Sequence, residues 1–411
     1  MPDPPAEPAS APTPVSAPAA PAASSAPAVA AAPAVDLEEL FPDYAPQNFA
    51  LRVAQERETW IAELQRAYLS QGLVLYLGAG VSMSVGLPSW SELIHALTVT
   101  MMSRKVNSSA RALEDLKGES RAVALESLLK EVQQRRDPQK PILMMARAIK
   151  DEMGDDLTFQ VALHLYGRLG GGFSSWLRRF LGGVLGGLGG GRAWGDFTLP
   201  RSQLLDAVVA LARPHRDVRG VQAMVNYNYD DLVEEWLRQE DVPCVTIRSG
   251  KDRQPRGSLP SFHVHGVLPV RAFVDARAPA EAKNTDAGNF VFSEDEYHTE
   301  YADPYRWSNL TQISLLGRHK GLFVGLSMQD PNLRRLIDVT HKQYPEIWNY
   351  AILPRSAPTP DEDAKGAILR NLSEDVEART FQKIGVKVIW VDDVTKDVAP
   401  VLDRIRTIPE D

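Results

Sequence analysis

The sequence predicts an α/β fold in which a Rossmann-type parallel sheet carries helices on both faces and has a helical insertion or subdomain. Short apolar runs typical of buried strands recur in the second half of the chain. Helical patterns separate several of them, as parallel pairing requires. The first apolar run, at residues 73–77, stands apart because a long and mostly helical stretch follows it. We therefore expect one sheet whose first two strands are separated by an insertion.

The elements are expected in the following order. Residues 50–70 form a helix, because Ile61, Leu64 and Tyr68 fall on one helical face. Residues 73–77 form the first strand. Strand patterns resume after a long helical block, at residues 221–227, 244–248, 262–265, 290–292, 321–326, 350–353 and 386–391. Helical patterns alternate with them at residues 232–238, 307–316 and 333–340.

Two segments differ in composition from the rest. Residues 1–45 are rich in Ala and Pro and are predicted to be a disordered tail, because such residues bury too little surface to offset the entropy of ordering. Residues 46–411 then form one domain. Its helical block at about 91–212 is predicted to be an insertion, and it includes a glycine-rich stretch at 167–195. We interpret this stretch as a flexible surface insertion, with a mobile lid and an amphipathic contact surface as alternatives.

The overall composition excludes several classes of protein. The 411 residues carry a formal net charge of −8, which argues against general nucleic-acid binding. The single cysteine, Cys244, excludes an internal disulfide framework and a multi-cysteine zinc site, and a reducing cytoplasm is the expected setting. We find no apolar stretch long enough to span a bilayer.

The most informative segment is the glycine turn at residues 78–80, directly after the first strand. Glycines let a ligand approach the backbone, and N–H groups at a strand–helix turn favour anions, so the segment resembles a phosphate cradle. The next glycine is Gly86, so the spacing does not fit the dinucleotide fingerprint, and the segment is not a Walker loop because no Gly-Lys-Ser/Thr follows. A plain tight turn is the alternative. Ser89 and Glu92 have the spacing of a helix capping box.

Polar residues also follow the expected second strand. Asn228 and Asp230 lie where a strand ends and a helix begins, and ligands of open α/β sheets bind beyond the carboxyl ends of strands. Asp230 or Asp231 can instead cap the helix, and both roles are compatible. The buried face of that helix is expected to carry Leu232, Val233, Trp236 and Leu237.

Two histidines mark the end of another strand. His263 and His265 are expected on one face of the strand, with Val264 pointing away and Gly266 ending it. Either ring can act as a general base, and a pair at this spacing can also suggest a metal site. No accompanying cysteine pair or carboxylate motif supports a metal. A structural role is the alternative for His263.

The strand at residues 321–326 ends in a similar small-residue turn. Gly325 and Ser327 leave room for a ribose or phosphate at the sheet edge. Asp330 and Pro331 are expected to be the N-cap and first residue of the next helix. For Asp330, capping is favoured over catalysis.

Taken together and in this order, the motifs resemble the sirtuin-like superfamily, and in particular the bacterial sirtuin-like NAD-hydrolysing branch of anti-phage systems. The resemblance covers roughly residues 50–395. Its motifs are Gly78-Ala79-Gly80-Val81-Ser82 with Gly86-Leu87-Pro88-Ser89-Trp90, then Tyr227-Asn228-Tyr229-Asp230, His265-Gly266 and Val324-Gly325-Leu326-Ser327-Met328-Gln329-Asp330, with further similar segments at 292–297 and 385–390.

The resemblance implies an NAD-binding catalytic domain over residues 46–411. It assigns the catalytic asparagine to Asn228 and the catalytic histidine to His265. The implied reaction is NAD glycohydrolysis, in which NAD is the substrate and no metal is needed, and the implied role is depletion of NAD during phage infection (abortive infection). The implied NAD contacts are Gly78, Ala79, Gly80, Ser82, Asp230, Gly325 and Ser327.

Two other functions are alternatives. An NAD-dependent protein deacylase is one, but deacylating sirtuins usually carry a four-cysteine zinc ribbon that this chain cannot build. The other is a non-enzymatic module that binds NAD or ADP-ribose. The resemblance further implies control by homo-oligomerisation or by a separate partner, such as a HerA-type ATPase or an Argonaute-type protein.

Overall fold

The computed structural model describes residues 36–109, 142–167, 169, 198–274 and 290–408. Residues 1–35 of the predicted tail and nearly all of the glycine-rich stretch lie outside the described residues. Residues 36–45, which the sequence assigns to the tail, contain the short helix α1 (Leu37–Leu40) and the 3-10 turn η1 (Pro42–Tyr44). Asp36 caps α1 through its side chain.

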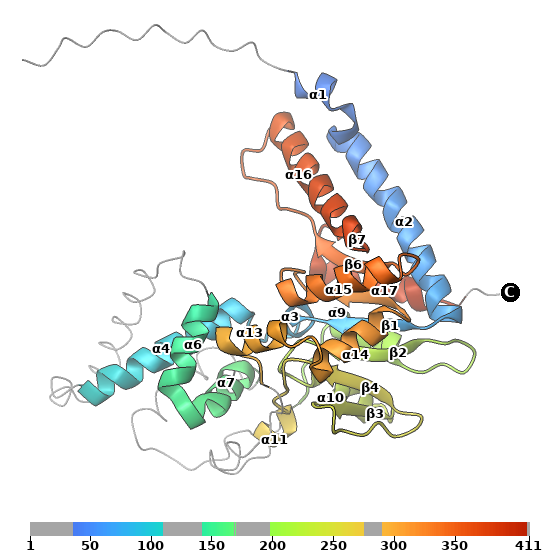
Figure 1. Ribbon diagram of the computed structural model, residues 1–411. Helices are drawn as coiled ribbons and strands as arrows, with labels where there is room; N and C mark the ends of the chain where they lie inside the picture. Colours follow the sequence, from blue (N-terminus) through green and yellow to red (C-terminus); the bar gives the residue numbers. More distant parts are fainter. Residues whose placement is uncertain (1–35, 110–141, 168, 170–197, 275–289, 409–411) are drawn as a thin grey trace, which may run out of the picture.

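Seven parallel strands form one sheet, which confirms the predicted Rossmann-like α/β fold (Figure 1). The strand order is β3-β4-β2-β1-β5-β6-β7, so β1 is central. After β1 the chain builds one side of the sheet and then crosses to the other with β5. The strands are β1 (Leu73–Leu77), β2 (Val221–Asn226), β3 (Cys244–Ile247), β4 (Leu259–His263), β5 (Lys320–Val324), β6 (Asn349–Pro354) and β7 (Val386–Val391).

The predicted strand at residues 290–292 is wrong. The segment is irregular, and the Val291 N–H donates one hydrogen bond to the His265 carbonyl at 3.0 Å. Phe292 is fully buried in a cluster of helical side chains instead of on the sheet. The apolar run at residues 290–292 therefore reflects burial against helices. In so short a segment, periodicity does not distinguish a buried irregular segment from a buried strand.

Helices cover both faces of the sheet. Alternate strand residues point to opposite sides, and the apolar side chains on each side are buried by helices. On β1, Leu75 packs into one cluster and Tyr76 into the other. The first face is covered by α2 (Pro46–Ser70), α9 (Gln203–Ala212), α10 (Leu232–Gln239) and α17 (Val394–Arg406). The second is covered by α14 (Trp307–Leu316), α15 (Pro331–Gln343) and α16 (Ala364–Lys383).

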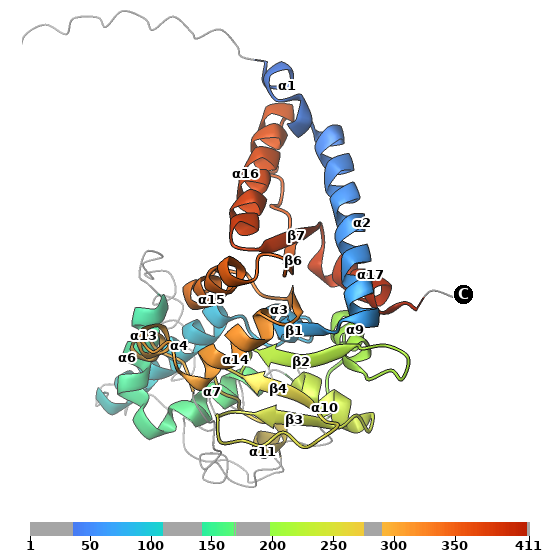
Figure 2. The same cartoon turned by 45° about the vertical axis from the view of Figure 1, so that its right-hand side comes forward.

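A helical subdomain lies to one side of the sheet (Figure 2). It has its own apolar cluster, which includes Leu97, Val161 and Phe292. The predicted insertion at 91–212 therefore divides: its last helix, α9, belongs to the sheet layers. The subdomain contains α4 (Trp90–Ser109), α6 (Ile142–Met153) and α7 (Leu157–Tyr166). From later in the chain, α13 (Glu294–Ala302) packs against α6, and α11 (Val270–Val274) contributes Val270 to the same apolar cluster. The Ser89–Glu92 capping box is confirmed at the start of α4.

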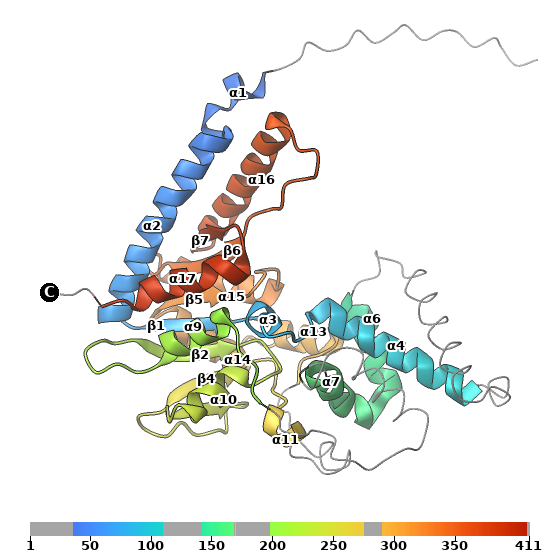
Figure 3. The same cartoon turned by 180° about the vertical axis from the view of Figure 1, so that it is seen from behind.

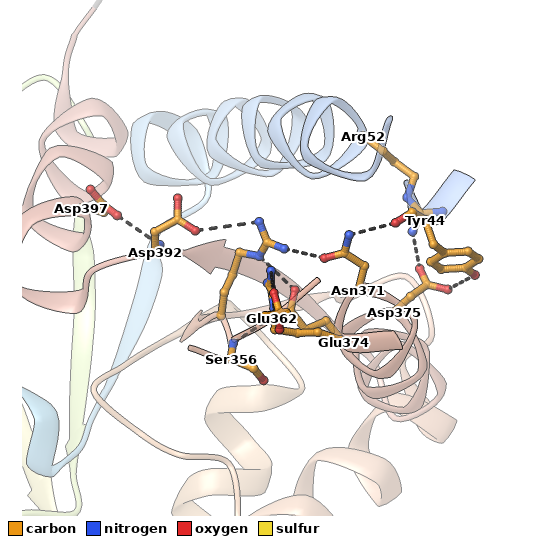
Figure 4. A network of polar contacts seen from close by, with 11 residues as sticks. Tyr44, Arg52, Ser356, Glu362, Asn371, Glu374, Asp375, Asp392 and Asp397 are labelled. Carbon is orange, nitrogen blue, oxygen red and sulfur yellow. Dashed lines mark hydrogen bonds and ion pairs between the residues drawn. The ribbon is translucent and has the colours of Figure 1, made fainter. Parts of the chain in front are cut away.

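Helices α2 and α16 project together from the sheet, with α1 at their outer end (Figure 3). A polar network joins them (Figure 4). Asp375 accepts hydrogen bonds from the Tyr44 hydroxyl at 2.8 Å and from Arg52 at 2.9 Å. Arg355, after β6, donates to Asn371 and Glu374 on α16. Among the described helices, none has the length and apolar character needed to cross a membrane.

Candidate active site

The site lies at the carboxyl edge of the sheet, where the turns after β1 and β5 pack against each other. A Cβ atom on Gly78 would lie 2.6 Å from the Gly325 carbonyl oxygen, and one on Gly80 would lie 2.7 Å from the Gly325 Cα. Gly325 itself has a φ of +70°, which side-chain-bearing residues adopt at a cost. Glycine at these positions therefore lets two neighbouring strands turn at the same point.

The same packing engages part of the expected phosphate cradle. The Gly78 N–H donates to the Val324 carbonyl at 3.0 Å, and the Gly80 N–H donates to the Gly325 carbonyl at 2.9 Å. Two N–H groups of the turn are thus bound within the protein. Ala79 opens the short helix α3 (Ala79–Met83), and the Val81 N–H of this helix donates to the Gly78 carbonyl at 3.0 Å. Contacts of NAD with residues 78–80 stay a prediction.

Asn228 follows β2 and reaches the β1 turn. Its side-chain Nδ2 donates to the Gly78 carbonyl at 3.0 Å, and its backbone N–H donates to Asn226 Oδ1 at 3.0 Å. The residue is 9 % exposed. Its Oδ1 has no hydrogen-bond partner among the described residues, so the carboxamide presents one acceptor in a fixed direction.

Asp230 and Ser82 are joined to each other. The Ser82 hydroxyl donates to Asp230 Oδ2 at 2.6 Å, and the Leu232 N–H donates to Asp230 Oδ1 at 3.3 Å. Asp231 occupies the N-cap position, whereas the side chain of Asp230 makes the capping contact. Burial raises the pKa of Asp230, opposed by the hydrogen bond from Ser82. This pair ties the β1 turn to the β2 turn.

His265 lies two residues beyond the end of β4, in a turn that Gly266 continues at a φ of +90°. Its ring meets Tyr227 edge-on at 4.9 Å and Tyr297 at 5.4 Å between ring centroids. Its Nε2 is 3.8 Å from Asp330 Oδ2, and the side chain is 13 % exposed. Burial lowers the pKa of His265, and the charge of Asp330 opposes that shift. The imidazole is therefore held neutral.

The expectation that His263 and His265 share one face of a strand is wrong. The strand ends at His263, so the alternation that the expectation assumes does not continue to His265. The His263 ring contacts Glu234 and the Asn228 carbonyl, whereas the His265 ring faces Asp330. The structural role considered for His263 therefore agrees with its burial.

Asp330, which the sequence marked as a helix cap rather than a catalytic residue, caps its helix and also faces the site. Its Oδ1 caps α15 by accepting from the N–H groups of Asn332 and Leu333, as expected. Its Oδ2 faces His265. Tyr297 was marked only by the 292–297 segment. Ser327 is exposed after β5, and Met328 beside it is buried with a φ of +58°.

This arrangement combines a fixed amide acceptor, a neutral imidazole and a nearby carboxylate at one edge of a parallel sheet. The imidazole can accept a proton, and the carboxylate can stabilise developing positive charge. No group of three or more His, Cys, Asp or Glu side chains within the described ranges is arranged to hold a metal ion.

None of the curated proteins matches the chain. The family model described as SIR2-like domain matches residues 222–389, which run from β2 to β7 and contain Asn228, His265 and Gly325. The β1 turn lies outside the matched residues, yet it packs against Gly325. A SIR2-like domain is compatible with NAD-related activity, and the match to residues 222–389 supports a sirtuin-like family for this chain.

Proposed function

We propose that the protein is an NAD glycohydrolase, which cleaves the bond between nicotinamide and ribose to give nicotinamide and ADP-ribose. The observation that carries the proposal is the convergence at one sheet edge of Asn228, His265 and the paired turns of β1 and β5. Open α/β sheets bind nucleotides at this edge, where the chain crosses from one half of the sheet to the other.

The proposed chemistry begins with cleavage of the bond between C1′ of the ribose and the positively charged nicotinamide ring. The ring takes the bonding electrons and leaves as neutral nicotinamide. The ribose then develops oxocarbenium character, as in glycoside hydrolysis. Asn228 Oδ1 accepts a hydrogen bond from a ribose hydroxyl or from the incoming water. His265 takes one proton from the water, whose oxygen bonds to C1′ of the ribose. Asp330 stabilises the positive charge on the sugar and on the imidazolium.

The test is nicotinamide release by the purified full chain, followed chromatographically, with variants of the two proposed residues. His265→Ala should lower the rate by about 10²–10⁴-fold, the usual contribution of a general base. Asn228→Ala should also lower the rate of release severely. His298→Ala is the matched control, because that side chain is 74 % exposed, and it should retain the wild-type rate.

Each variant's thermal melt is compared with that of the wild type. Wild-type rates in both site variants would overturn the assignment of these residues. O-acyl-ADP-ribose formed only with an acylated peptide would instead establish the deacylase.

We further propose, from the order of the motifs, that this activity depletes NAD during phage infection. Control by self-assembly or by a partner of the HerA-type ATPase or Argonaute-type class belongs to the same proposal. Co-expression with a genomic neighbour tests it: NAD in infected cells should fall with the wild-type chain and stay constant with His265→Ala.

A further inference from the structure

A pair of ionisable side chains lies against the backbone of Asn228. Glu234 on α10 and His263 at the end of β4 are both fully buried, with side chains 0 % exposed. His263 Nε2 is 2.9 Å from Glu234 Oε1, and His263 Nδ1 is 3.2 Å from the Asn228 carbonyl oxygen. The Ser261 hydroxyl also donates to Glu234 Oε1.

The contacts define the protonation state of the pair. A carboxylate and a backbone carbonyl only accept hydrogen bonds, so both nitrogens of His263 must carry hydrogens. Burial alone would lower the pKa of His263, but the charge of Glu234 raises it. Burial would raise the pKa of Glu234, but the charge of His263 and its hydrogen bonds lower it to about 2. The pair is therefore imidazolium and carboxylate.

Glu234 also reaches the other side of Asn228. Asn226 Nδ2 donates to Glu234 Oε1 at 3.3 Å, and Asn226 Oδ1 accepts the Asn228 N–H at 3.0 Å. One carboxylate oxygen thus orients two side chains, Asn226 and His263. These bind the N–H and the carbonyl of Asn228, so the backbone on both sides of the candidate catalytic residue is fixed.

We propose that Glu234, acting through His263 and Asn226, is the positioning residue that aims the Asn228 carboxamide at the substrate. The inference rests on the proposed function, in which Asn228 orients the reacting ribose. Buried ion pairs are weak contributors to stability when compared with apolar packing, so stability alone gives little reason for this pair at this place. A misplacement of about 1 Å at a reacting group can lower the rate by about 10²-fold.

The first test replaces charge without changing shape. Glu234→Gln should lower kcat for NAD cleavage by about 10²-fold, while KM changes little, because orientation is lost in the transition state. Glu374→Gln is the matched control. That carboxylate is also buried, at 1 % exposure, but it binds Arg355 and the Ser356 N–H in the polar network of α2 and α16 (Figure 4). It should leave kcat unchanged.

The second test separates positioning from stability. His263→Asn keeps an amide donor at the place of Nδ1, whereas His263→Leu removes the donor, and both lose the partner of Glu234. Their melting temperatures should fall together, but His263→Asn should retain a clearly higher kcat per folded molecule. Equal kcat values in the two variants, or a wild-type kcat in Glu234→Gln, would overturn the inference.

Asn228→Ala distinguishes this failure from failure of the proposed function. If Asn228→Ala is inactive and Glu234→Gln is fully active, the function stands and the positioning role is wrong. If Asn228→Ala retains the wild-type rate, the assignment of Asn228 is wrong, and the positioning role falls with it.

Discussion

Gly325 provides the sharpest structural prediction, because the site depends on the contact between the β1 and β5 turns. In Gly325→Ala, the new Cβ would lie 2.7 Å from the Val81 backbone nitrogen and 3.0 Å from the Gly80 Cα. Both are backbone atoms, which cannot rotate away as a side chain can. The β5 turn must therefore move from the β1 turn or distort.

The expected loss of stability follows from two contributions. A φ of +70° costs an L-residue about 1–2 kcal/mol. Separation of the turns weakens the hydrogen bonds from Gly78 to Val324 and from Gly80 to Gly325, each contributing about 0.5–1.5 kcal/mol. We therefore expect Gly325→Ala to lower the free energy of unfolding by about 2–5 kcal/mol.

Gly86→Ala is the control for the backbone conformation alone. Gly86 has a φ of +91°, but nothing lies within 4 Å of its would-be Cβ. It should cost only about 1–2 kcal/mol. The assay is urea unfolding of both variants, with NAD cleavage per folded molecule as a second readout. Equal losses of stability in the two variants would refute the claim that glycine is needed at position 325 because the β1 and β5 turns approach each other closely.

Three further predictions concern titratable groups. Because burial lowers the pKa of His265, kcat/KM should fall on the acid side with an apparent pKa below 6.5, and a value above 6.5 would contradict a buried neutral base. Asp330→Asn keeps the helix cap, so the free energy of unfolding should change by less than about 0.5 kcal/mol. Loss of the Asp330 charge should shift the acid limb of the kcat/KM profile to still lower pH, and an unshifted limb would contradict the contact between Asp330 and His265. Burial raises the pKa of Asp231 to about 7, so the folded state holds its proton more tightly than the unfolded state, and stability is lost as pH rises. Asp231→Asn still accepts from the Val270 N–H, and its stability advantage should grow by roughly 2 kcal/mol between about pH 5 and pH 7 in denaturant titrations, whereas a constant difference would contradict the raised pKa.

The sequence was sufficient for the parallel sheet, because buried strands read as short apolar runs that end in polar or glycine turns. Helix starts with side-chain caps were equally readable, as at Ser89 and Asp330. The prediction of a strand at 290–292 was wrong because an apolar run of three residues is too short to show the periodicity of a strand or of a helix. The sequence predicted a phosphate cradle at residues 78–80, but it did not show that the Gly78 and Gly80 N–H groups bind carbonyls of β5 and its turn, which lie far away in the chain.

The candidate site was recoverable as far as its strand-end motifs. Its supporting contacts were not, because they join segments distant in sequence. Periodicity placed Leu232, Val233, Trp236 and Leu237 on the buried face of α10, yet Glu234 and Glu235 are buried as well. Their burial depends on cationic partners, His263 for Glu234 and Arg238 for Glu235, and a helical period carries no information about such partners.

The central claim is that the nicotinamide ribose of NAD lies between the Asn228 carboxamide and the His265 ring. The most direct measurement is a crystal structure of His265→Ala with NAD, since this variant should bind NAD and cleave it about 10²–10⁴-fold more slowly. We expect the ribose beside Asn228 Oδ1, at the paired turns of β1 and β5. Density for the dinucleotide elsewhere on the molecule, with this edge of the sheet empty, would contradict the account.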